Sequence, residues 1–280
     1  MIVSYTRILF AALLLLVAGS VHARNVDELM RKSGIWKQVT DFPAMVRAGA
    51  DEARKKERAS GKTVMTDAEY ARLVAIFDRA FAPDRMRRII AREIDRNLGV
   101  EDEAKMLAFL DSDLGKRATR LEEQASTPEM MKEAQENAAA YFLQVPGARV
   151  AKLMRLARAV EIGDASASMM INVAAALAYG AAVSAPNGDE REAKELRKQL
   201  QAKKPEMAEA MYQYFVKFFA YIYRPLSDED LDRYIEFAQT PAAKHFTQVT
   251  QKAFNVAFED GALEAGRNIG REAGKRDRTS

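Results

Sequence analysis

Start signals for α-helices recur along the chain, and no segment alternates apolar and polar residues for long enough to predict a β-sheet. Residues 66–69 read Thr-Asp-Ala-Glu, a capping box in which the first and last side chains satisfy each other's backbone amides. Ser227 precedes three acidic residues, which the helix dipole favours in a first turn. Thr127-Pro128 and Thr240-Pro241 place an N-cap threonine before proline. We therefore expect an all-α fold, a multi-helix bundle of ten or more helices.

The N-terminus has the pattern of a secretory signal peptide. Arg7 supplies positive charge, residues 8–18 are an unbroken apolar run, and a small-residue pattern ends at Ala23. At about 1.5 Å per residue the run spans roughly 17 Å, well short of about 30 Å of bilayer hydrocarbon. We expect residues 1–23 to direct export through the Sec route and to be cleaved after Ala23. The alternative is an uncleaved anchor.

Composition excludes several classes of site. The 280 residues include no cysteine, which rules out disulfides, zinc–thiolate sites, iron–sulfur clusters and thiol catalysis. The net charge of +3 is too balanced to predict a nucleic-acid partner. Asp111, Asp113 and Glu122 have part of the spacing of a calcium-binding loop, but Lys116 stands where that loop needs glycine. We expect helix capping there, and neither a metal ion nor a cofactor.

A shift of 128 residues reveals a weak internal repeat. It aligns residues 94–118 with 222–246, with seven identical positions among twenty-five, including Phe109 with Phe237. The repeated unit is a helix, a capped turn and a second helix, and chance similarity is the alternative. We expect degenerate copies at about 66–126 and 205–259 inside one all-α domain of residues 24–260.

The repeat also carries a family resemblance. Its second copy has an acidic helix start at 226–231, then Phe237, then Thr240-Pro241, and its first copy has Phe109, Ser112 and Gly115. The pattern resembles the exported bacterial family called domain of unknown function 2059. Each copy departs from the family: the first lacks the proline, and the second has Ala243 in place of glycine. The resemblance implies an α-helical protein of the Gram-negative periplasm, with no assigned reaction.

Two central segments are unusually apolar. Residues 212–223 hold seven aromatic side chains, of which Tyr212, Phe215, Phe219 and Tyr223 form one helical stripe. This stripe predicts either a central core helix or the wall of an apolar ligand site or dimer surface. Residues 165–187 carry no charge and are long enough for a membrane span, but their many alanines favour a buried, closely packed helix. We expect no transmembrane span in the mature chain.

The C-terminus combines small and basic residues. Ala262, Gly266, Gly270 and Gly274 recur every four positions between basic side chains. We expect residues 261–280 to form a Gly-rich basic tail, either frayed or docked on an acidic partner or anionic envelope material.

The sequence predicts a non-enzymatic binding or interaction protein, acting on another protein or on itself. His245 is the only histidine after the leader. The sequence has neither a Gly-x-Ser-x-Gly elbow nor a Ser-x-x-Lys motif to accompany it, so we expect His245 on the surface. The first alternative is a carrier of a lipid or other apolar ligand, with Tyr212, Phe215, Phe219 and Tyr223 as candidate ligand-binding residues. The second alternative is a hydrolase that uses His245.

Overall fold

The computed structural model describes residues 25–60, 65–186 and 188–276. The predicted signal peptide lies outside these residues. The described part of the chain folds into thirteen α-helices and contains no strand, so the all-α prediction is confirmed. The helices are α1 (Val26–Lys32), α2 (Ile35–Ala59), α3 (Asp67–Ala80), α4 (Pro83–Asn97), α5 (Val100–Leu110), α6 (Asp113–Ala125), α7 (Pro128–Phe142), α8 (Gly147–Ala159), α9 (Ile162–Ala182), α10 (Glu190–Ala202), α11 (Lys204–Ile222), α12 (Asp228–Ala238) and α13 (Pro241–Arg276).

Side-chain caps fix where several of these helices begin. The Thr66 hydroxyl accepts a hydrogen bond from the Glu69 amide at 3.3 Å, and the Glu69 carboxylate accepts one from the Thr66 amide at 2.8 Å. Thr127 and Ser227 accept bonds from amides three residues later, at 3.3 Å and 3.1 Å. Each cap satisfies an amide that has no partner inside its own helix. The helix starts predicted at these positions are confirmed.

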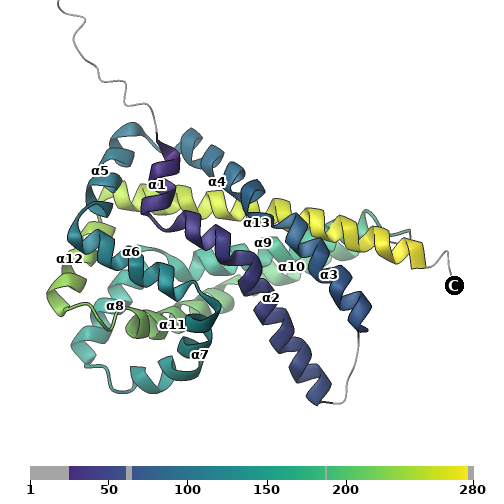
Figure 1. The fold of residues 1–280 in the computed structure, drawn as a ribbon, viewed down its shortest axis with the longest axis horizontal. Helices are drawn as coiled ribbons and strands as arrows, with labels where there is room; N and C mark the ends of the chain where they lie inside the picture. Colours follow the sequence, from purple (N-terminus) through teal and green to yellow (C-terminus); the bar gives the residue numbers. More distant parts are fainter. Residues whose placement is uncertain (1–24, 61–64, 187, 277–280) are drawn as a thin grey trace, which may run out of the picture.

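Two apolar cores lie on either side of the molecule. The first core joins α1 to α5 with α13 and contains Leu29, Ile90 and Ile94. The second joins α6, α7, α8, α11 and α12 and contains Leu153 and Leu231. Helix α13, which has 36 residues and is about 54 Å long, runs along the molecule beside α9 (Figure 1). Helix α13 therefore belongs to the first core, and it packs against α9, which in turn packs against α11 of the second core.

Glycines let α9 and α13 approach closely. A Cβ atom at Gly266 would collide with the carbonyl oxygen of Leu177, and one at Gly180 would collide with that of Leu263. A Cβ at Gly274 would lie 2.6 Å from the side chain of Pro186. The small-residue face is therefore covered by α9. The expected boundary between residues 260 and 261 is wrong as a structural division, because residues 261–276 continue α13 without a break.

Helix α9 is the one helix in the described ranges that is long and apolar enough to cross a membrane by length and composition. It is packed within the protein against α8, α10, α11 and α13. Its polar Asn172 donates a hydrogen bond to Asn255 of α13 at 3.1 Å. These contacts describe a helix held among other helices on several sides.

The α5–α6 and α12–α13 hairpins meet through residues that lie 128 positions apart in the sequence. The rings of Phe109 and Phe237 stack with centroids 3.6 Å apart and planes 6° apart. Arg117 of α6 pairs with Asp230 of α12 at 2.7 Å, and His245 of α13 pairs with Asp102 of α5 at 2.6 Å. Shifting either ion pair by 128 residues gives the positions of the other. The two hairpins therefore contact each other reciprocally.

Candidate ligand-binding cavity

A cavity of about 500 Å³ lies where the two apolar cores meet. This volume falls in the range of about 300–1,000 Å³ that is typical of small-molecule sites. Helices α2, α6, α7, α8, α9, α11, α12 and α13 all contribute to its wall. The apolar part of the wall includes Val39, Phe42, Met45, Met131, Leu156, Ile162, Met169, Phe215, Phe218, Phe219, Ile222, Phe254 and Phe258. The cavity is partly open to solvent, and its wall is mainly apolar, with Gln38 and Ser126 among its polar residues.

The predicted aromatic stripe of α11 divides between two environments. Phe215, Phe219 and Tyr223 line the cavity, with ring centroids 6.0 Å and then 5.5 Å apart along the helix. Tyr212 lies outside it: its hydroxyl donates to the carbonyl of Met154 at 3.4 Å, and Arg158 lies over its ring. The structure therefore brings three of the four predicted residues together.

One carboxyl group interrupts the apolar wall. Of the described residues that line the cavity, Glu122 of α6 alone carries a charge. Its Oε1 accepts hydrogen bonds from the hydroxyls of Tyr223 at 2.6 Å and Tyr234 at 2.7 Å. Within the described part of the chain, Oε2 accepts no hydrogen bond. The arrangement leaves one carboxyl oxygen free to bind a ligand.

Burial changes the acidity of all three groups. It raises the pKa of Glu122 above its ordinary value, and the two tyrosine hydroxyls partly oppose this by stabilising the carboxylate. Burial, with the nearby negative charge of Glu122, also raises the pKa of Tyr223 and of Tyr234 well above the usual value. Both tyrosines therefore stay protonated at neutral pH and remain hydrogen-bond donors to Glu122.

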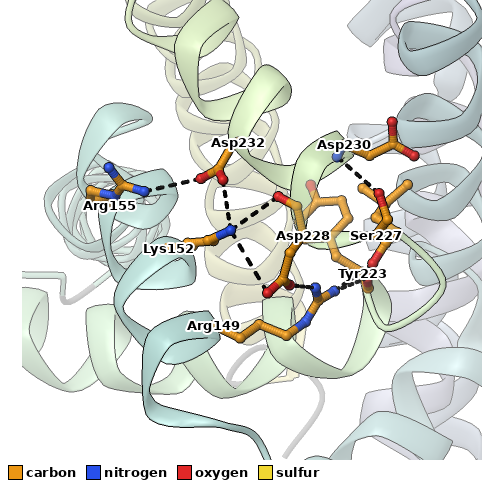
Figure 2. Close-up of polar contacts among 9 residues, drawn as sticks. Arg149, Lys152, Arg155, Tyr223, Ser227, Asp228, Asp230 and Asp232 are labelled. Atoms are coloured by element: carbon orange, nitrogen blue, oxygen red, sulfur yellow. Dashed lines mark hydrogen bonds and ion pairs between the residues drawn. The ribbon is translucent and has the colours of Figure 1, made fainter.

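A polar cluster at the end of α11 holds Tyr223 in place (Figure 2). Arg149 of α8 donates to the backbone carbonyls of Tyr223 at 2.9 Å and Leu226 at 2.8 Å, and it pairs with Asp228. Lys152 donates to Asp232 at 2.7 Å, one turn further along α12. The cluster satisfies carbonyls left open at the end of α11 and ties α8 to α12. It acts as a support for the cavity and lies outside its wall.

The other candidate sites considered from the sequence lie apart from this cavity. His245 has a half-exposed side chain whose Nδ1 contacts Asp102, and no serine hydroxyl bonds to it among the residues described. Asp111 pairs with Lys32 at 2.8 Å while Glu122 is bound by tyrosines, so the acids of the calcium-like pattern do not converge. Over the described ranges, no group of three or more His, Asp or Glu side chains is placed to hold a metal ion.

Several lining residues were not predicted as part of a site. Glu122 was considered only as a calcium ligand, and Tyr234 was not singled out. Phe42, Phe254 and Phe258 come from α2 and α13, far from the aromatic stripe in the sequence. The spacing of Phe254 and Phe258, four residues apart, marks a helix face but does not indicate which helix it meets.

No protein-family model, curated protein or solved structure matches this chain.

Proposed function

We propose that this protein is an exported, non-enzymatic binding protein that holds one apolar small molecule between its helices. The observation that carries the proposal is the cavity of about 500 Å³, walled by aromatic and aliphatic side chains with a single carboxyl group. An empty apolar cavity of this size forfeits packing contacts, so a bound ligand would recover stability. The sequence pattern of residues 1–23 supports export, and the resemblance to the exported family supports a Gram-negative periplasmic location.

The alternative of a protein partner has weaker support. From the sequence, the Gly-rich face of the C-terminal segment was the surface expected to dock on a partner. That face is occupied by α9 of the same chain. A hydrolase has weaker support still, because the partner of His245 is Asp102 and no serine hydroxyl bonds to it among the described residues.

We also propose that the two hairpins descend from one repeated unit. Helices α5 and α12 begin and end at positions 128 apart, and α6 and α13 begin at positions 128 apart. The stacked Phe109 and Phe237 and the reciprocal ion pairs support a pseudo-twofold relation, in which equivalent residues exchange partners. In this proposal the second copy has lengthened its last helix, which contributes to the first core and packs along α9.

The test is a fluorescence titration with N-phenyl-1-naphthylamine, a neutral apolar probe that brightens in apolar surroundings. We expect saturable binding at one site per chain. Ala125→Phe adds a ring at a buried position in the cavity wall, and we expect it to weaken binding by about tenfold or more, or about 1.4 kcal/mol. Native mass spectrometry of gently purified protein should show a co-purifying apolar molecule.

The matched control is Leu143→Phe, which places the same ring at a site that is 85% exposed. We expect this variant to bind the probe as the wild type does. The proposal is wrong if the wild type shows no saturable binding, or if a folded Ala125→Phe variant binds as tightly as the wild type.

A further inference from the structure

A second, smaller cavity adjoins the large one. It has a volume of about 110 Å³, which is enough for several water molecules. Glu122, Val160 and Tyr234 line both cavities. The hydrogen bond from Tyr234 to Glu122 therefore lies in the wall that the two cavities share.

The small cavity has a larger share of polar side chains than the large one, although nine of its fourteen lining residues are apolar. Its wall includes the hydroxyl-bearing side chains of Ser33, Thr119 and Thr247 in addition to Glu122 and Tyr234. The hydroxyls of Thr119 and Thr247 make no hydrogen bond within the described ranges. Hydroxyl groups and a carboxyl oxygen without partners suit a small polar group, whereas the large cavity suits a hydrocarbon.

The charge of this double site discriminates between polar groups. Among the described residues that line either cavity there is no lysine, arginine or histidine, and Glu122 is the one charged side chain. In its ionised form Glu122 would repel an anionic group, and no lining cation would balance the two charges. A hydroxyl or ammonium group would instead donate a hydrogen bond to Glu122 Oε2.

The geometry points to an amphiphile whose hydrocarbon part fills the large cavity and whose non-anionic, hydrogen-bond-donating head group lies against Glu122 in the small one. This inference rests on the proposed function, because it names the class of ligand for the same site. Alcohols and protonated amines share the required chemistry, and the experiment separates them from each other and from carboxylates.

The experiment displaces bound N-phenyl-1-naphthylamine with dodecan-1-ol, dodecylamine and dodecanoate, which share one chain and differ in the head group. At about pH 8 dodecanoate is ionised and dodecylamine is protonated. We expect the alcohol, the amine or both to displace the probe from the wild type at concentrations about tenfold or more below that for dodecanoate. Glu122→Gln keeps the size of the side chain and removes its charge, and should reduce that preference several-fold.

Glu136→Gln is the matched control, since Glu136 of α7 is exposed and lines neither cavity. It should keep the wild-type preference. Equal or tighter binding of dodecanoate to the wild type would overturn the inference, and so would an unchanged preference in a folded Glu122→Gln variant. If the probe itself does not bind, the proposed function fails first and the inference fails with it. If the probe binds but all three amphiphiles displace it equally, only the inference fails.

Discussion

Glu122 shows how one residue can serve a site while reducing stability. Its carboxyl group sits in a mainly apolar wall, and the hydroxyls of Tyr223 and Tyr234 are its hydrogen-bond partners among the described residues. Burial favours the protonated form, so the pKa of Glu122 is higher in the folded state than in the unfolded chain. Between those two pKa values the folded state binds more protons than the unfolded state. The contribution of Glu122 to stability therefore falls as the pH rises through that window.

Glu122→Gln should reveal this linkage. The glutamine keeps an oxygen acceptor for both tyrosines and cannot ionise. We expect the melting temperature of the variant, relative to the wild type, to increase steadily as the pH is raised from about 4 to 8, measured by circular dichroism. Glu136→Gln, at an exposed position of α7, serves as the control at each pH. A relative melting temperature that falls with pH would mean that ionised Glu122 stabilises the fold.

The contribution of Asp230 to stability depends on pH in the opposite direction to that of Glu122. Asp230 is buried, and its pairing with Arg233, together with Arg117 of the other hairpin, lowers the pKa of its carboxyl group. Its stabilisation is present above the unfolded pKa and is lost as the pH falls through the folded pKa. Asp230→Asn should lower the free energy of unfolding at neutral pH by about 1–2 kcal/mol in urea titrations, the partners being partly solvated.

Glu229→Gln is the control for Asp230→Asn, because Glu229 occupies the same first turn of α12 and is exposed. We expect its effect to stay within about 0.5 kcal/mol. Equal effects of the two substitutions would show that the contact of Asp230 with Arg117 adds no stability beyond that of a negative charge in the first turn of α12. The Asp230→Asn effect should also shrink in acid.

Which residues join the site was predictable only in part. The stripe of Phe215, Phe219 and Tyr223 was visible because helical periodicity is local. The pairing of Tyr223 and Tyr234 with Glu122 was not visible in the sequence, since Glu122 lies 101 and 112 positions away from them in the chain. No periodicity connects such distant positions, and a carboxyl group in an apolar wall is an exception to the rule that charges face water. Tyr212 lies outside the cavity because it stands eleven residues, or about 16 Å, before Tyr223 along the helix, where it contacts α8.

At the scale of helices, the sequence left the C-terminal segment either frayed or docked, and the structure shows residues 261–276 as a continuous part of α13. Each glycine costs about 1 kcal/mol of helix propensity, which suggested a frayed tail. That cost is offset in α13 because the glycines allow the backbone of α9 to approach, and tertiary packing supplies most helical stability in proteins. The caps at Thr66, Thr127 and Ser227 were predictable because each depends only on its own neighbours.

Two glycines provide a direct test of this argument. Gly266→Ala would push a methyl group into the backbone of α9, and we expect it to destabilise the protein by about 1–3 kcal/mol in urea titrations. Gly49→Ala lies in α2 with nothing within 4 Å of the added atom, and we expect it to stabilise by about 0.5–1 kcal/mol. A neutral or stabilising effect at Gly266 would contradict the close packing of α9 and α13.

At the scale of the whole molecule, the cavity is where two cores meet without filling the space between them. Val39, Phe42, Phe254 and Phe258 belong to or border the first core, whereas Phe219 and Ile222 belong to the second. The all-α class followed from local signals repeated along the chain. The space between the cores did not follow from local signals, because it depends on how α2, α11 and α13 are placed relative to one another. Proteins commonly sacrifice stability at binding sites, and an unfilled apolar space is one form of that sacrifice.

Placing a larger side chain in the space between the cores should therefore increase stability and weaken probe binding. Burial of the ring in Ala125→Phe should raise the free energy of unfolding of the ligand-free protein by about 1–2 kcal/mol. The wild type should gain about 2.7 kcal/mol in the presence of probe at about 100 times its Kd, and the variant should gain little at the same concentration. Urea unfolding with and without N-phenyl-1-naphthylamine measures both effects, with Leu143→Phe expected to behave as the wild type. A variant that still gains the wild-type increment would show that the probe binds elsewhere, because the space between the two cores would already be occupied by the new ring.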